Sequence, residues 1–179
     1  MEVRGGSVSI RLYILIILSL GFCCCRNNKA VKDPGNKPGA ADMEELNRYM
    51  IRKDRERIIS YIERKDLHMT ESPTGLWYQI IEPGIGDFLK EDIPLTMEYE
   101  CSLLDGTVCY SSDESGPMKI VLGRTSIEPG LSEGLKLLKP GARAIFILPP
   151  FLARGLPGDG RKIPARSVIV YKVNILSEK

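Results

Sequence analysis

Apolar residues recur along residues 42–65 with the spacing of an amphipathic helix of about five or six turns. No glycine or proline interrupts this stretch, and most positions between the apolar ones are charged. Asp42 and Glu45 stand three residues apart at its start, which predicts a capping box with Asp42 as the N-cap. The stripe is predicted to pack against the rest of the chain or, alternatively, against a partner or a dimer mate. It comprises Leu46, Met50, Ile51, Ile58, Ile59 and Ile62.

After Pro73 the apolar positions fall in short runs separated by glycine and proline, which is typical of β-strands. Asp105-Gly106 predicts a two-residue turn between two of the strands, and one short helix is predicted over 130–138. The expected fold class is α+β: an antiparallel β-sheet wrapped on one short α-helix and preceded by the amphipathic N-terminal helix. The predicted strands cover residues 76–82, 95–104, 108–111, 118–122, 143–148 and 168–175.

The first 22 residues have the pattern of a lipoprotein signal peptide. Arg4 and Arg11 give it a positive start. The apolar run over residues 12–20 is shorter than the roughly 20 residues that span a bilayer. A short uncleaved membrane anchor is the alternative interpretation of this segment.

Leu20-Gly21-Phe22-Cys23 resembles a bacterial lipobox, which makes Cys23 the predicted lipidated residue. Cys24 and Cys25 remain alternatives, because phenylalanine is large for the position before the cut. Residues 23–41 are rich in small and polar residues, proline and glycine, and are expected to form a flexible tether. The remaining chain is divided into a helical segment, 42–72, and a globular domain, 73–179. These features predict a lipid-anchored protein of the cell envelope that faces the periplasm or the cell surface.

The composition excludes several classes of function. A net charge of +2 gives no reason to expect a nucleic-acid partner. The single histidine, His68, argues against a histidine-based catalytic triad and a multi-histidine metal site. No phosphate loop, metal-ligand spacing or nucleophile–base pair stands out, so neither a metal nor a cofactor is predicted. The function is therefore expected to come from a shaped apolar pocket.

Apart from Cys23, Cys24 and Cys25, the chain has two cysteines, Cys101 and Cys109. In a hairpin with a two-residue turn, Ser102 would lie opposite Cys109, and Tyr110 opposite Cys101. The two thiols would then face opposite sides of the sheet, so no disulfide between them is expected.

Several separated motifs in a fixed order resemble the FK506-binding protein (FKBP) family of peptidyl-prolyl isomerases. The resemblance covers residues 75–176 and implies the fold and the activity of that family. The leader, tether and helix also resemble its lipid-anchored, gliding-motility-associated members. The matching motifs are Tyr99, Asp105-Gly106, Ser111-Ser112, Leu122-Gly123, the run from Ile127 to Leu135, Lys139-Pro140-Gly141, Ala153-x-Gly155, Ile163-Pro164 and Tyr171.

The resemblance also implies which residues form the pocket. Tyr99, Ile127 and Tyr171 would be the catalytic residues, and the backbone N–H of Ile127 would anchor the peptide. The implied substrate-binding residues are Cys109, Tyr110, Met118, Glu128, Leu131, Arg154 and Ile163.

Four of these positions depart from the usual pattern of the family. Cys109-Tyr110 stands where the family has Phe-Asp, Glu128 where it has an aliphatic residue, and Arg154 where it has a ligand-binding tyrosine. The pocket is therefore expected to be shallower and more polar at its rim. The loop after residue 150 adds basic residues, expected to form a solvated rim or, alternatively, to favour acidic groups beside the target proline. They are Arg154, Arg161, Lys162 and Arg166.

The predicted function is peptidyl-prolyl cis–trans isomerisation that assists the folding of extracytoplasmic proteins. The substrates would be proline-containing polypeptides, and the membrane would be contacted through the lipid anchor. The alternative is a non-catalytic FKBP-like binding module in a cell-envelope or motility assembly, which the altered pocket positions favour.

Overall fold

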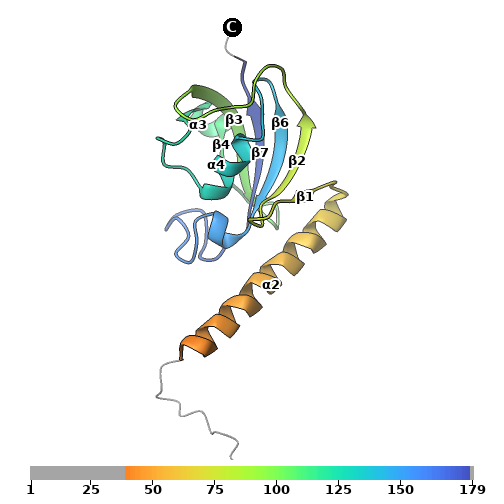
Figure 1. The fold of residues 1–179 in the computed structure, drawn as a ribbon, viewed down its shortest axis with the longest axis vertical. Helices are drawn as coiled ribbons and strands as arrows, with labels where there is room; N and C mark the ends of the chain where they lie inside the picture. The colour runs from red at the N-terminus through yellow and green to blue at the C-terminus, as the bar shows by residue number, and fades with distance from the viewer. Residues whose placement is uncertain (1–38, 178–179) are drawn as a thin grey trace, which may run out of the picture. The chain divides into compact units, whose positions relative to one another are not determined.

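The sheet has an apolar face that packs against a short helix (Figure 1). The computed structural model describes residues 39–177; the predicted signal peptide, the lipidation site and nearly all of the tether lie outside them. The elements are α2 (Ala40–Lys65), β1 (Thr70–Glu71), β2 (Trp77–Glu82), β3 (Pro94–Leu103), β4 (Val108–Ser111), α3 (Ser112–Ser115), β5 (Met118–Val121), α4 (Pro129–Leu135), β6 (Arg143–Leu148), the 3-10 turn η1 (Pro150–Leu152) and β7 (Ile169–Ile175).

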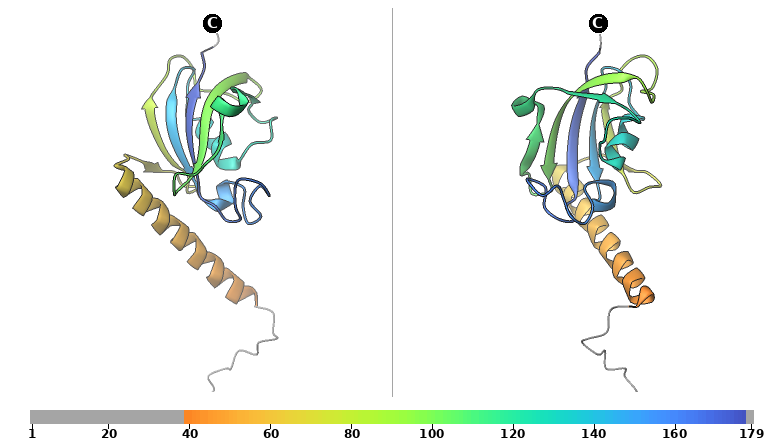
Figure 2. Two further views of the ribbon diagram at one scale, coloured as in Figure 1. Left: turned by 180° about the vertical axis from the view of Figure 1, so that it is seen from behind. Right: turned by 90° about the vertical axis from the view of Figure 1, so that its left-hand side faces the viewer.

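All paired strands are antiparallel and belong to one seven-stranded sheet. The strand order is β1-β2-β6-β7-β3-β4, and β5 also pairs with β3. Figure 2 shows the sheet from two further sides, with the short helix α4 beside it. The predicted α+β architecture is confirmed. The predicted strands 108–111 and 143–148 match β4 and β6 at both ends, and the other four predicted strands differ by one residue at one end or both. The two-residue strand β1 was not predicted.

The face of the sheet toward α4 holds the main core. Leu131 and Leu135 of α4 are fully buried and join Phe146 of β6 in one cluster. Gly134 lies against the same ring: a Cβ at this position would stand 2.8 Å from ring carbons of Phe146. The glycine therefore lets α4 approach the sheet closely.

Helix α2 packs against the opposite face of the sheet through its C-terminal half. Ile58 and Tyr61 are buried in a second cluster with Ile145, Ile147, Val168 and Val170. In the N-terminal half, Leu46 and Ile51 are 50% and 42% exposed. The prediction that the stripe packs against the chain is confirmed for the C-terminal half. A partner or dimer contact remains a prediction for the N-terminal half.

The predicted N-cap of this helix is wrong. The helix begins at Ala40, so Asp42 lies in its first turn. Alanine has the highest helix propensity, and an acidic side chain in the first turn is stabilised by the helix dipole. These two effects explain why the helix extends two residues beyond the expected start. No helix within residues 39–177 is both long and apolar enough to cross a membrane.

The expected positions of the two cysteines are also wrong. Cys101 pairs with Tyr110 as predicted, but Ser102 pairs with Val108 because the register shifts between these pairs. This β-bulge turns Cys109 toward the same core as Cys101. Both are buried free thiols, and they do not lie on opposite faces.

Candidate functional site

The residues that the sequence assigned to a pocket converge on the α4 side of the sheet. Their burial divides them into two groups. The buried ones are Cys109, Leu131, Ile163 and Tyr171, and those packed against them while partly exposed are Tyr99, Tyr110, Met118 and Ile127. The partly exposed group supplies the surface that a ligand can touch, whereas Leu131 and Cys109, at 0% and 1% exposure, act through packing.

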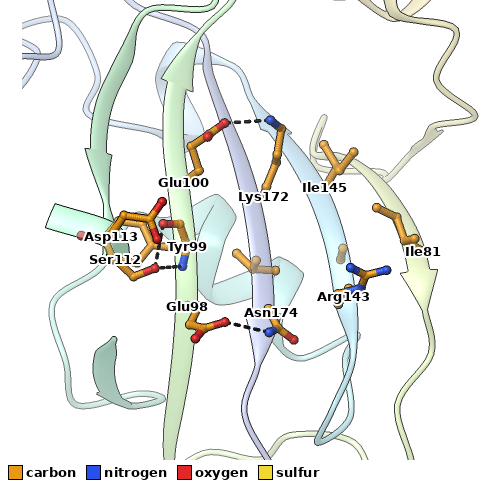
Figure 3. A pocket seen from close by; sticks show the side chains of 12 residues that line it. Ile81, Glu98, Tyr99, Glu100, Ser112, Asp113, Arg143, Ile145, Lys172 and Asn174 are labelled. Carbon is orange, nitrogen blue, oxygen red and sulfur yellow. Dashed lines mark hydrogen bonds and ion pairs between the residues drawn. The ribbon is translucent and has the colours of Figure 1, made fainter. Parts of the chain in front are cut away.

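Tyr99 on β3 is held at both its ring and its backbone. Its ring lies 6.3 Å from that of Tyr171, tilted by 43°. Its hydroxyl lies 3.4 Å from Ser115 Oγ. Ser112 Oγ accepts from the Tyr99 N–H at 3.0 Å and donates to its carbonyl at 3.3 Å, a clamp visible in Figure 3. The sequence identified Ser112 only as part of a motif; the structure shows that it fixes the strand beside the pocket.

A buried carboxylate forms the polar centre of the site. Glu128, which is 3% exposed, immediately precedes α4. Its Oε1 lies 2.7 Å from Arg154 Nε in an ion pair and accepts a hydrogen bond from the Tyr171 hydroxyl at 3.1 Å. The sequence identified Glu128 and Arg154 as separate departures from the family pattern, and the structure joins them with Tyr171 in one network. The charge of Glu128 is thereby compensated within an otherwise apolar pocket.

Two neutral groups beside this carboxylate are held in their protonated forms. Burial raises the pKa of Tyr171, and the nearby Cys101 and Glu128 raise that pKa further. Burial likewise raises the pKa of the Cys101 thiol to about 12. Tyr171 is therefore a hydrogen-bond donor, and Cys101 is not a thiolate nucleophile.

The loop from η1 to β7 is tied to β4 through Asp159. The Tyr110 hydroxyl donates a short hydrogen bond to Asp159 Oδ2. Asp159 Oδ1 accepts from the backbone N–H groups of Arg161 and Ile163, at 2.8 Å each. Sequence analysis did not identify Asp159. The available signal was an aspartate before glycine in a loop, a residue type that often caps its own turn.

The basic residues of this loop do not form one rim. Arg154 binds Glu128, and Lys162 Nζ lies 3.2 Å from Glu114 Oε2 and 5.4 Å from the Tyr110 ring centroid. Arg166 donates to Asp54 of α2 at 2.7 Å. Arg154 and Lys162 stay about half exposed, at 45% and 49%, so a solvated rim remains a prediction for them, whereas Arg166 is directed to the buried Asp54 of α2.

A separate cavity of about 390 Å³ lies over the face of the sheet opposite α4 (Figure 3). Charged and amide side chains line it in pairs: Lys172 with Glu100 at 2.8 Å, and Asn174 with Glu98 at 2.9 Å. Tyr99 reaches its edge, but the other predicted pocket residues do not line it. Within residues 39–177 no group of three or more His, Cys, Asp or Glu side chains is arranged to hold a metal ion.

The sequence profile described as FKBP-type peptidyl-prolyl cis–trans isomerase matches residues 87–176, which include every pocket residue named above. The chain belongs to this FKBP family. The resemblance of the motifs is thereby confirmed for the family, and the match includes all four positions that depart from its usual pattern.

Curated relatives from bacteria support the same assignment. A probable FKBP-type isomerase, FkpA, of Neisseria meningitidis is 38% identical over 104 residues, covering 58% of this chain and 38% of the relative. FkpA of Escherichia coli K12 is 34% identical over 119 residues, covering 64% of this chain and 42% of the relative. The chain thus aligns with less than half of the length of either relative.

Solved structures share the fold. The crystal structure of Escherichia coli FkpA superposes with a TM-score of 0.59 at 22% identity, covering 98% of this chain and 74% of that one. The N-terminal domain of FKBP42 from Arabidopsis thaliana gives a TM-score of 0.57 at 23% identity, covering 62% and 91%. At these identities the likeness establishes the FKBP fold.

Acid should loosen the turn that Asp159 holds. Burial raises the pKa of Asp159, but hydrogen bonds from Tyr110 and two backbone N–H groups outweigh it and hold the pKa below the ordinary 3.8. A pKa lowered by folding adds stability above the unfolded-state pKa, and this stability is lost as the pH falls through the folded-state pKa. Tyr110→Phe removes one of these bonds, so it should reduce the drop in Tm between about pH 6 and about pH 3. An equal drop in Tm for both proteins would contradict this role of Tyr110.

Proposed function

We propose that this protein is a peptidyl-prolyl cis–trans isomerase acting on proline-containing polypeptides. One observation carries the proposal: a chain of the FKBP family brings Tyr99, Met118 and Ile127 together, partly exposed, over one buried apolar cluster. Tyr99, Ile127 and Tyr171 are the proposed catalytic residues. The backbone N–H of Ile127 is the proposed anchor for the peptide.

An apolar pocket suits this reaction because no bond is made or broken. Rotation about an X–Pro bond crosses a barrier of roughly 18–20 kcal/mol, since the twisted amide loses its resonance. Without a catalyst, exchange takes tens of seconds or longer. The twisted amide is less polar than the planar one, so a site that excludes water stabilises it relative to the ground state. Neither an acid nor a metal is needed for this stabilisation.

The test is the isomerisation of a short proline peptide by the full chain. We expect exchange faster than the uncatalysed rate, and about tenfold slower catalysis by Tyr99→Ala, because the substitution removes one wall of the pocket. Tyr49→Ala is the matched control, since Tyr49 is an exposed tyrosine of α2 outside the pocket cluster. A native rate equal to the uncatalysed rate would refute the proposal.

One feature favours the second candidate, a non-catalytic FKBP-like binding module in a cell-envelope or motility assembly. The Glu128–Arg154 pair places charge where the family pattern has an aliphatic and an aromatic residue. Such a pocket would bind a partner with polar groups near the proline rather than accelerate rotation. This candidate predicts binding of proline peptides without acceleration of their exchange.

The leader supports a place in the cell envelope. We propose that the chain is a lipoprotein of the gliding-motility-associated type, anchored through Cys23 or a neighbouring cysteine, and that it assists the folding of extracytoplasmic proteins. The support is the Leu20-Gly21-Phe22-Cys23 pattern after a short apolar run. Replacement of all three cysteines by serine should release the protein from the membrane fraction or leave an unprocessed precursor. A variant that is processed and membrane-bound as before would refute the lipid anchor.

A further inference from the structure

The loop that carries Arg154 and Ile163 depends on one residue at its base. Arg166 closes the loop by donating its backbone N–H to the carbonyl of Gly155, at 3.2 Å. Its φ of 53° lies in the left-handed region, which residues other than glycine rarely adopt. Such a conformation persists only where surrounding contacts enforce it. The contact that enforces it is therefore important for the shape of the loop.

Besides this backbone bond, Arg166 has a side-chain contact with helix α2. Arg166 Nη2 donates to Asp54 Oδ2 at 2.7 Å, and the Asp54 side chain is only 8% exposed. A second ion pair joins the helix to the sheet, between Arg55 and Glu71, and its side chains are 53% and 31% exposed. The buried pair is the more restrictive of the two, because a buried carboxylate is stable only with a well-placed partner.

Apolar packing does not hold this part of the loop against the helix. A cavity of about 260 Å³ lies between them, lined by residues of both elements together with Asp54 and Arg166. The large side chains around it stay open to solvent: Leu156 is 69% exposed, Phe151 50% and Ile51 42%. The Asp54–Arg166 pair thus spans a loosely packed region and fixes the distance between helix and loop.

The loop base is connected to the pocket through one peptide bond. Gly155, which accepts from the N–H of Arg166, directly follows Arg154. Arg154 in turn binds Glu128, the carboxylate at the centre of the pocket. A shift of the loop base therefore moves the guanidinium that compensates the buried charge.

We propose that Asp54 and Arg166 are positioning residues through which helix α2 holds the pocket loop in its peptide-binding conformation. This inference rests on the proposed isomerase function. A loop that adopts the binding conformation only part of the time lowers the apparent affinity by that fraction. Loss of the pair should therefore raise the KM for a proline peptide and leave kcat nearly unchanged.

The test compares two substitutions in the full chain that each remove a paired carboxylate. Asp54→Asn breaks the buried pair with Arg166 and a 3.8 Å pair with Arg57 of the same helix, and Glu71→Gln breaks the exposed pair with Arg55. Asp54→Asn should raise KM about tenfold, whereas Glu71→Gln, which breaks the exposed pair, should change it less than about twofold. Arg166→Lys keeps the charge but loses the planar guanidinium, and should raise KM in the same direction by a smaller factor. It also keeps the inference testable if Asp54→Asn fails to fold.

Amide hydrogen exchange tests the positioning role of Asp54 and Arg166 independently of isomerase activity. The amides of Ile163 and Arg166 should exchange faster in Asp54→Asn than in Glu71→Gln, even if no isomerase activity is found. Equal exchange at these amides in the two variants would overturn the inference, as would equal KM values in an active protein. An inactive native protein in which only Asp54→Asn speeds this exchange would refute the isomerase and leave the positioning role intact.

Discussion

Arg154→Ala is expected to destabilise the protein by about 3 kcal/mol, because it leaves the carboxylate of Glu128 buried without its cation. This value lies at the lower end for a broken buried pair, since the Arg154 side chain is 45% exposed and water can reach part of the space it leaves. Urea denaturation of the native and variant chains measures the difference. The variant should have a lower midpoint and a nearly unchanged slope.

A double variant shows how much of this loss of stability comes from the unpaired charge of Glu128 and how much from the lost packing of the Arg154 side chain. Glu128→Ile with Arg154→Ala removes both charges and should cost only about 1 kcal/mol, because the Tyr171 hydroxyl alone loses its acceptor. Restoring an apolar residue should also raise the isomerase rate above that of the native chain. A double variant less stable than Arg154→Ala would show that Glu128 stabilises the fold through other contacts.

Gly158→Ala is expected to cost about 3 kcal/mol or more and to weaken peptide binding. At a φ of 70°, an added Cβ is strained by roughly 1–2 kcal/mol. It would also stand 2.3 Å from the carbonyl oxygen of Ile163, which is backbone and cannot rotate away. Relieving that overlap requires a backbone shift worth about 1–3 kcal/mol. The shift would displace Ile163 from the pocket.

Gly160→Ala is the matched control for this effect. Gly160 has nearly the same φ, 69°, but no atom lies within 4 Å of the position of its Cβ. It should show the conformational cost alone, about 1–2 kcal/mol. Differential scanning calorimetry measures the loss of stability in both variants. The difference between the two losses is the cost of the overlap between the Cβ added at Gly158 and the Ile163 carbonyl oxygen. Equal losses of stability at the two positions would mean that the loop relaxes around the new methyl group.

The β-rich unit could be predicted from sequence because the turn residues between its strands are visible and family motifs fix their order, and the same motifs predicted which residues gather in or against one apolar cluster. The β-bulge at Cys109 could not be predicted, since one additional residue in a strand leaves the composition of the turn unchanged. The sequence could not predict that α2 packs only through its C-terminal half. The spacing of apolar residues shows which side of a helix is buried, but not how many of its turns contact the rest of the chain. The pairing of Glu128 with Arg154 was hidden because the two residues are far apart in sequence and meet only when the loop folds over α4.

The packing of α2 also bears on the order in which the molecule is assembled during synthesis. The partners of Ile58 and Tyr61 lie on β6 and at β7, and Asp54 meets Arg166 across 112 residues of chain. The helix therefore leaves the ribosome long before any surface exists to receive it. Contacts of such long sequence separation form late, because the intervening chain must first be ordered. A chain that stalls before β7 would carry an uncovered apolar helix face, a feature by which chaperones and proteases distinguish unfinished proteins from complete ones.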